Sequence, residues 1–306
     1  MDGLILVNKP SGYTSHDVII NLRKAFHTQR IGHFGTLDPL ATGLLIVAVG
    51  NATRLFPFFS KADKLYTGQI TLGFSTDTYD SEGKPTSPEV KEWPKKDALL
   101  ETMKRLEGEI EQIPPLFSAK KYRGKPLYTL ARRKKELPLK PCRVFIYFFR
   151  LRRFSPPLIN FEVECSSGTY IRSLAHDLGQ ILGCGAHLSA LERVETGGFK
   201  LSEAHTLEEI KEHTKEGKME QFFIPIESIL PQFPKIILTL SGSLMAKNGN
   251  MIYPESILKV VSNTPEKASF SRGNEAVFRL FNEEGKLLAF ARKGTEDRLH
   301  PFLVMS

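Results

Sequence analysis

Cysteine is scarce in this chain of 306 residues. There are three cysteines, Cys142, Cys165 and Cys184, and no two of them have the C-x-x-C spacing. An odd number without that spacing argues against a disulfide framework and against a structural zinc site. Cys165 lies in an alternating apolar run, which predicts a core residue rather than a nucleophile.

Long apolar runs are also missing. No stretch approaches the roughly 18 apolar residues of a membrane span. The N-terminal segment MDGLILVNKPSG has no basic start and only a short apolar run before Lys9-Pro10, unlike a signal peptide. We therefore expect no membrane association and a cytoplasmic location.

Acidic residues are fewer than basic residues. The chain has 42 Lys and Arg against 34 Asp and Glu, a net charge of +8. A basic surplus favours polyanionic partners through counterion release, although many unrelated proteins share it. Hydrophobic residues make up 41% of the chain, enough for a well-packed core, and the length allows more than one domain.

Helical and strand periodicities both occur along the first 225 residues. Helices are expected at 15–26 and 171–182, where apolar side chains recur on one face, and an amphipathic helix at 98–106. Capping-box patterns, Thr14 with Asp17 and Thr206 with Glu209, predict two helix starts. Apolar or alternating runs predict strands at 4–7, 44–49, 64–74, 143–149 and 159–165.

The residue pattern changes in the C-terminal part of the chain, from about residue 222 onward. A proline-containing stretch around 222–233 is typical of a linker. Short strands are then expected at 236–240, 276–281, 287–292 and 302–305, with an Asn-Glu-Glu-Gly turn at 282–285. These features predict a separate, small, β-rich domain of about 70 residues.

The most informative segment is the glycine-punctuated run from Gly32 to Gly43, GHFGTLDPLATG. Its simpler interpretation is a helix start, with Asp38 as the cap and Pro39 at the first helical position. The functional interpretation is a ligand site. Glycines let a ligand approach the backbone closely, and Pro39 holds Asp38 extended so that its carboxylate is presented rigidly.

This run resembles the signature of the TruB family of pseudouridine synthases, in which the aspartate of the motif is catalytic. The corresponding residue here is Asp38. Further segments resemble the family in the same order along residues 3–200: VNKP at 7–10, DKLY at 63–66, QIPP at 112–115, SGTYIR at 167–172 and CGAH at 184–187. The final 70 residues resemble, more loosely, the PUA domain, a small RNA-binding module.

The resemblance implies roles for five further residues. Tyr66 would stack on the target uracil, Arg172 would pair with Asp38, and Tyr170 and Leu191 would line the same pocket. His33 would occupy the space that the uridine vacates when it leaves the loop stack. The alternatives are a core tyrosine for Tyr66, a surface charge for Arg172 and an ordinary loop residue for His33.

Segment 118–140 is rich in Lys and Arg and has one acidic residue, Glu136. It resembles the RNA-gripping insert of the family, and the alternative is a solvated charged loop. If it contacts RNA, the expected phosphate contacts are Lys120, Lys121, Arg123, Lys125, Arg132 and Arg133.

The expected fold class is therefore α+β, with a mixed sheet in a catalytic domain at 1–225, a linker at 226–234 and a PUA-like RNA-binding domain at 235–306. The expected activity is isomerisation of uridine to pseudouridine at position 55 in the tRNA T loop, without a guide RNA. We expect a monomer that needs no metal, cofactor or protein partner. The alternatives are a guide-dependent rRNA synthase and a non-catalytic RNA-binding or RNA-folding protein.

Overall fold

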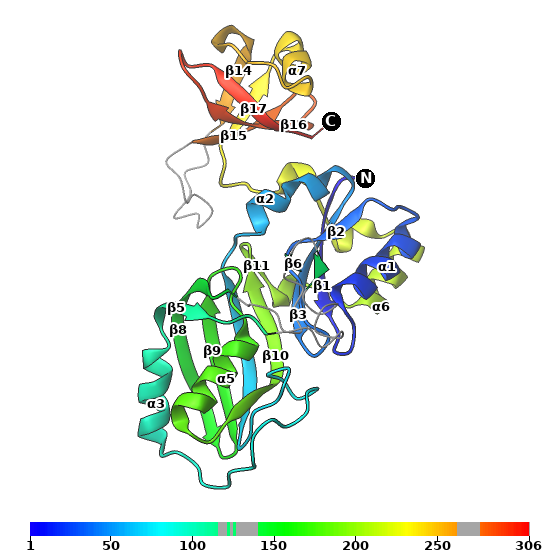
Figure 1. Ribbon diagram of the computed structural model, residues 1–306. Helices are drawn as coiled ribbons and strands as arrows, with labels where there is room; N and C mark the ends of the chain where they lie inside the picture. The colour runs from blue at the N-terminus through cyan, green and yellow to red at the C-terminus, as the bar shows by residue number, and fades with distance from the viewer. Residues whose placement is uncertain (116–120, 123–124, 127–139, 262–275, 306) are drawn as a thin grey trace.

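The computed structural model describes residues 1–115, 121–122, 125–126, 140–261 and 276–305. These residues form a ten-stranded sheet, a five-stranded sheet and a two-stranded pair, with helices packed beside them, which confirms the α+β class (Figure 1). Within the described ranges, no helix is long and apolar enough to cross a membrane.

The larger sheet has ten strands in the order β12-β1-β3-β10-β4-β9-β8-β5, with β2 added on β3 and β11 on β10. The β3–β10 pair is parallel, whereas the other pairs are antiparallel, so the sheet is mixed as predicted. Its strands are β1 (Gly3–Lys9), β2 (Ile31–His33), β3 (Thr42–Val49), β4 (Lys64–Leu72), β5 (Gly108–Gln112), β8 (Cys142–Ser155), β9 (Leu158–Cys165), β10 (Ala186–Thr196), β11 (Phe199–Lys200) and β12 (Phe223–Pro225).

Helices pack beside this sheet, and their ends follow from local sequence. The α-helices are α1 (Ser15–Phe26), α2 (Phe56–Phe59), α3 (Lys96–Arg105), α5 (Ile171–Leu182) and α6 (Leu207–Lys215). Both predicted capping boxes are present, at the starts of α1 and α6. Helix α5 ends at Gly183, whose φ of 76° lies in the left-handed region that favours glycine. Short 3-10 turns span Gly50–Leu55, Leu201–Glu203, Met219–Gln221 and Ile226–Ser228.

Helix α5 lies against β10 and α3, and α1 lies beside α6 (Figure 1). The main core fills the space between these helices and the sheet. Fully buried side chains from the strands, such as Ile70 and Val163, meet Leu174 and Leu178 of α5 there. Cys165 belongs to this core, as predicted.

The second sheet has five strands in the order β14-β13-β15-β16-β17, together with helix α7 (Leu240–Lys247) and a 3-10 turn at Pro254–Ser256. Its strands are β13 (Lys235–Leu238), β14 (Ile257–Val261), β15 (Val277–Phe281), β16 (Leu287–Lys293) and β17 (Leu299–Val304). That residues 235–306 form a PUA-like domain stays a prediction.

The segment between the two sheets, predicted as a linker at 226–234, is packed rather than free. Ile226, Ile229 and Leu230 are buried in a cluster that also contains Leu6 of β1 and Phe290 of β16. The guanidinium of Arg279 donates hydrogen bonds to the carbonyl oxygens of residues 227, 229, 231 and 233. The two sheets are therefore joined through a shared apolar contact.

Candidate active site

The loop that carries Asp38 connects β2 to β3 and is tied to α1. The backbone N–H of Leu37 donates to Ser15 Oγ at 2.9 Å, and that hydroxyl donates to the Leu37 carbonyl at 3.1 Å. Gly43, with φ of 97°, ends the loop where the backbone passes β10. A Cβ there would lie 2.5 Å from the Arg193 carbonyl oxygen. Close packing on both sides therefore holds the loop.

Asp38 is not a helix cap. No helix begins at Pro39, and the chain turns instead, with the Ala41 N–H donating to the Asp38 carbonyl at 3.1 Å. The Asp38 side chain stays 39% exposed. The helix-start interpretation is therefore wrong, and the carboxylate is left partly exposed rather than used to cap a helix.

Arg172 joins Asp38 to a second carboxylate. Its Nε lies 2.9 Å from Asp38 Oδ2, and its Nη1 lies 3.2 Å from Asp80 Oδ2. The Arg172 and Asp80 side chains are only 6% and 5% exposed. The predicted contact between Arg172 and Asp38 is therefore present, and Arg172 is not an ordinary surface charge.

Asp80 is a site residue that the sequence patterns did not predict, because they indicate only a polar loop around it. The Glu82 N–H donates to Asp80 Oδ1 at 3.1 Å, and the Thr78 hydroxyl bonds the same oxygen. Residue 80 also pairs with Leu188 in a single parallel bridge beside β10. Asp80 thus binds the Nη1 end of the Arg172 guanidinium, while Asp38 binds its Nε.

Burial raises the pKa of Asp38 above the ordinary aspartate value, and the neighbouring Asp80 carboxylate adds to this. Arg172 and Lys9 act in the opposite direction, because their positive charges favour the ionised carboxylate. Although 39% of the side chain is exposed, the surrounding protein atoms still replace part of the water around the carboxylate. The result is a carboxylate more basic than one on an open surface.

Lys9 lies beneath the loop and is fully buried, although its residue type is normally exposed. Its Nζ donates to the carbonyl oxygens of Pro10 at 2.8 Å, Tyr13 at 2.7 Å and Pro39 at 3.4 Å. Burial lowers the Lys9 pKa to about 8. Lys9 was not predicted for the site, although a lysine directly after an apolar strand is a signal for it.

Tyr66 lies on β4 opposite Arg193 of β10, and both are buried. Arg193 is fully enclosed and donates from Nε to the Leu44 carbonyl at 2.7 Å and from Nη2 to the Gly35 carbonyl at 3.1 Å. Burial raises the Tyr66 pKa to about 12, so its phenol keeps its proton at neutral pH. Arg193, also absent from the predicted set, thus links β10 to the Asp38 loop.

The remaining predicted residues lie around this centre. Leu191 is 9% exposed and sits on β10 opposite Gly68. Tyr170 is the N-cap residue of α5, two residues before Arg172. Its backbone N–H donates to the Gln112 side chain at 2.9 Å, and the Gln112 amide donates to its carbonyl at 3.2 Å. His33 ends β2, and burial lowers its pKa with a further contribution from Arg193.

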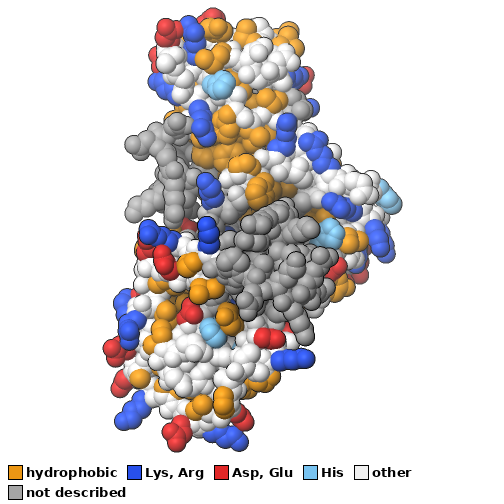
Figure 2. All heavy atoms as spheres, in the orientation of Figure 1, with side chains coloured by type: hydrophobic (Ala, Val, Ile, Leu, Met, Phe, Trp, Pro, Cys, Tyr) orange, Lys and Arg blue, Asp and Glu red, His pale blue; other side chains and the backbone are white. Residues whose placement is uncertain are grey.

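The predicted RNA contacts lie mostly outside the described residues. Lys121 and Lys125 have a described backbone, in the two-stranded pair β6 (Lys121–Tyr122) and β7 (Lys125–Pro126). Lys120, Arg123, Arg132 and Arg133 are beyond the described ranges. Elsewhere on the viewed face, Lys and Arg side chains recur across the middle of the molecule (Figure 2).

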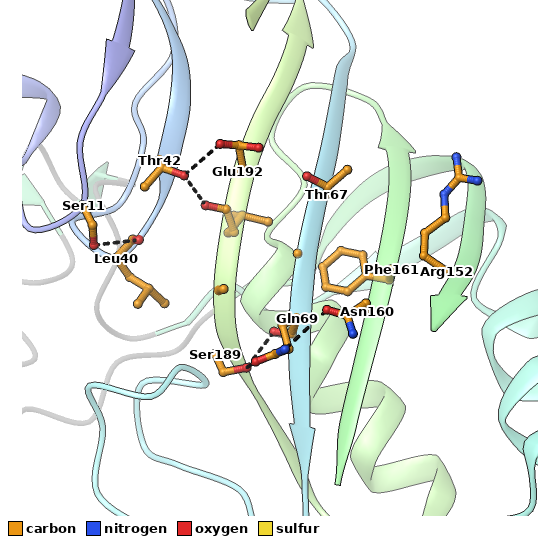
Figure 3. A pocket seen from close by; sticks show the side chains of 13 residues that line it. Ser11, Leu40, Thr42, Thr67, Gln69, Arg152, Asn160, Phe161, Ser189 and Glu192 are labelled. Atoms are coloured by element: carbon orange, nitrogen blue, oxygen red, sulfur yellow. Dashed lines mark hydrogen bonds between the residues drawn. The ribbon is translucent and has the colours of Figure 1, made fainter. Parts of the chain in front are cut away.

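A pocket of about 540 Å³ lies beside the site, on the face of the sheet that carries Thr67 and Gln69 (Figure 3). Its polar part is a hydrogen-bonded group in which Ser189 donates to Gln69 and Gln69 donates to Asn160. It includes Leu191 but not Asp38, Tyr66 or Arg172. This pocket therefore does not coincide with the cluster of Asp38, Tyr66 and Arg172.

Comparison with known proteins matches residues 23–171 to the TruB family pseudouridylate synthase N-terminal domain. Residues 172–231 match the tRNA pseudouridylate synthase B C-terminal domain. The tRNA pseudouridine synthase B of Solibacter usitatus is 36% identical over 305 residues, covering 100% of both chains. The chain belongs to the TruB family of pseudouridylate synthases.

Other members of the TruB family agree. The tRNA pseudouridine synthase B of Bacillus cytotoxicus is 39% identical over 90% of this chain and 91% of its own. That of Opitutus terrae is 43% identical over 76% of this chain and 95% of its own. Among solved structures, one in a Cbf5-Nop10-Gar1 complex has a TM-score of 0.72 at 26% identity, covering 99% of this chain and 85% of that one.

Proposed function

We propose that this TruB-family protein is a stand-alone enzyme that converts uridine 55 of the tRNA T loop to pseudouridine, with Asp38 as its catalytic residue. The observation that carries this is the arrangement around Asp38. A partly exposed carboxylate, held at 2.9 Å by a buried arginine, lies within the family's aspartate motif.

The reaction is an isomerisation. The N1–C1′ glycosidic bond breaks, the uracil rotates, and C5 joins C1′, so that C5 loses a proton and N1 gains one. No net oxidation or hydrolysis takes place. In this proposal the ionised Asp38 attacks the sugar or the uracil covalently, or takes a proton to allow glycal formation. Arg172 keeps the carboxylate ionised and oriented in either route.

The uracil reaches Asp38 only after it has left the RNA stack, which costs a few kcal/mol. Stacking on an aromatic side chain offsets part of this cost, typically by ~1–3 kcal/mol per base. Tyr66 is proposed for this role, with Leu191 and Tyr170 as walls of the base pocket. Its phenol, with a pKa of about 12, presents a neutral ring. His33 is proposed to occupy the space left in the RNA.

The choice of tRNA as substrate is supported by the relatives. A protein named tRNA pseudouridine synthase B aligns with the whole chain at 36% identity, whereas the matching chain of the solved Cbf5-Nop10-Gar1 complex reaches 26%. A guide-dependent synthase is the alternative with the same chemistry. Segment 118–140 and residues 235–306 are proposed as further RNA contacts, the latter as a PUA-like module.

The test is to incubate the purified protein with unmodified tRNA and with a T-arm stem-loop, and to map pseudouridine by mass spectrometry. We expect modification at position 55 of both, without any guide. Asp38→Asn should abolish turnover while tRNA affinity stays within about threefold, because the substitution removes one charge but no stacking surface.

Asp97→Asn is a matched control, because this aspartate lies in the first turn of α3, away from the site. It should leave turnover unchanged. Full turnover by Asp38→Asn would overturn the catalytic assignment, and modification that requires an added guide RNA would favour the guide-dependent alternative. Tight binding without modification by the wild-type protein would indicate a non-catalytic RNA-binding protein.

A further inference from the structure

The loop that carries Asp80 contacts α5 at two points. Asp80 binds Arg172, and the ring of the preceding residue, Tyr79, stacks on His176 with centroids 3.9 Å apart and planes 17° apart. Arg172 and His176 are four residues apart, so their side chains lie on one face of α5, one turn apart. Two consecutive loop residues therefore bind two consecutive turns of the helix.

The backbone of Tyr79 explains how both side chains reach the same helix. In an extended chain, neighbouring side chains point to opposite sides. Tyr79 has φ of 63°, in the left-handed region that residues with a Cβ rarely adopt, and this breaks the alternation. Such a conformation persists only where its surroundings hold it.

Two sets of contacts hold Tyr79. On the backbone, the Leu188 N–H donates to the Tyr79 carbonyl at 3.0 Å, and the Ser81 N–H donates to the Leu188 carbonyl at 2.9 Å. On the side chain, the ring lies flat on His176. Burial lowers the His176 pKa, so at neutral pH the stack joins two uncharged rings.

We propose that the stack of Tyr79 on His176 is a positioning device that holds Asp80 against Arg172 and, through Arg172, keeps Asp38 in its reactive geometry. This rests on the proposed function. Tyr79 does not touch Asp38 and acts through two intermediate residues. It fixes Asp80, Asp80 binds Nη1 of Arg172, and Nε of Arg172 binds Asp38. Without the ring, the strained residue relaxes and Asp80 moves away from Arg172.

The test compares variants at residue 79 under single-turnover conditions on a T-arm stem-loop. Tyr79→Ala should lower the rate constant about tenfold with the apparent affinity for RNA unchanged, since displacements of about 1 Å cost that much or more. The acid limb of the pH–rate profile should also move to higher pH. A displaced Arg172 favours the ionised Asp38 less, and this outweighs the smaller, opposite effect of moving the Asp80 carboxylate away. Tyr79→Phe, which keeps the ring, should restore both the rate and the limb.

Tyr79→Gly distinguishes the effect of the ring from the effect of backbone strain, because glycine lacks the ring but adopts this φ without strain. If the ring matters, Tyr79→Gly is impaired like Tyr79→Ala. His176→Ala should reproduce the defect, and the double variant Tyr79→Ala/His176→Ala should be no worse than either single one. His213→Ala is a matched control, since it removes another contact between a histidine and an aromatic ring, with Phe222, from α6.

Asp177, next to His176, has a pKa raised to about 6 by burial, so its titration could overlap the acid limb. The pH–rate profiles are therefore also measured in an Asp177→Asn background, in which the acid limb is assigned to Asp38. A normal rate and acid limb in Tyr79→Ala or Tyr79→Gly would overturn the proposal. So would a Tyr79→Phe as impaired as Tyr79→Ala, or a loss confined to RNA affinity. Asp38→Asn in the same assay distinguishes the proposed function from the positioning role. An active Asp38→Asn variant would refute the proposed function. An inactive Asp38→Asn together with a normal Tyr79→Ala would refute only the positioning role.

Discussion

Replacing Arg172 by glutamine should move the acid limb of the pH–rate profile upward. In the proposed mechanism Asp38 must be ionised to act, so activity should fall as the pH drops through its pKa. Burial already raises that pKa, which places the wild-type limb above the ~3.9 of an unperturbed aspartate. Arg172 opposes the rise, and removing it raises the pKa further.

The size of this shift follows from the ion-pair geometry. With Nε 2.9 Å from Oδ2, the two charge centres are about 4 Å apart, which corresponds to ~4 kcal/mol at an effective dielectric constant of ~20. That energy equals ~3 pH units. Because the Asp38 side chain is 39% exposed, water screens the pair, and we expect a shift of about 1–2 units.

The assay is the single-turnover rate on a T-arm stem-loop between pH 5 and pH 9. Arg172→Lys should shift the limb less, because it keeps the charge but loses the planar geometry that binds two carboxylates. Removal of the guanidinium also leaves Asp80 buried without its charge partner, which costs ~3–5 kcal/mol of stability. Arg172→Gln is therefore also measured together with Asp80→Asn, which relieves that cost. An acid limb that stays at the wild-type pH in both backgrounds would refute the role of the pair.

Three further predictions concern stability and binding. Asp38→Asn should raise the Tm at pH 8 by removing a carboxylate whose raised pKa disfavours the fold above that pKa. The gain, below ~1 kcal/mol after screening, should vanish only well below the unfolded-state pKa of ~3.9, and a lower Tm at pH 8 would contradict it. Tyr66→Ala should weaken T-arm binding by ~1–3 kcal/mol through lost stacking, whereas Tyr66→Phe should bind normally; equal losses in a filter-binding assay would exclude stacking. Deleting 118–140 should weaken tRNA binding and reduce the slope of log K against log salt by ~0.7–0.9 for each lost phosphate contact, and an unchanged slope would move the RNA surface elsewhere.

Local sequence accounts for much of the fold. Helices α1 and α5 begin and end at the predicted residues, because a capping box starts α1, Gly183 ends α5, and one apolar face runs through each. Strand β10 was not predicted. Two bulges, between Leu188 and Ala190 and between Arg193 and Glu195, shift the phase of its side chains, so its sequence does not alternate. Helix α7 was not predicted either. Leu240 and Leu244 are apolar but exposed, so the apolar residues of this helix do not lie on one buried face.

The sequence by itself determined which carboxylate to propose as reactive. Asp38, the glycines around it and Pro39 are neighbours along the chain, so their resemblance to the TruB motif is visible without the fold, whereas their spacing alone also fits a helix start. The partners of Asp38 are another matter. Lys9, Asp80 and Arg172 come from a strand, a loop and a helix far apart in sequence, and each in isolation has the pattern of an ordinary polar residue. The resemblance implied the contact of Arg172 with Asp38, but only the tertiary structure places its Nε 2.9 Å from Asp38 and brings Lys9 and Asp80 near enough to act on the Asp38 pKa, because burial and proximity are properties of the folded chain.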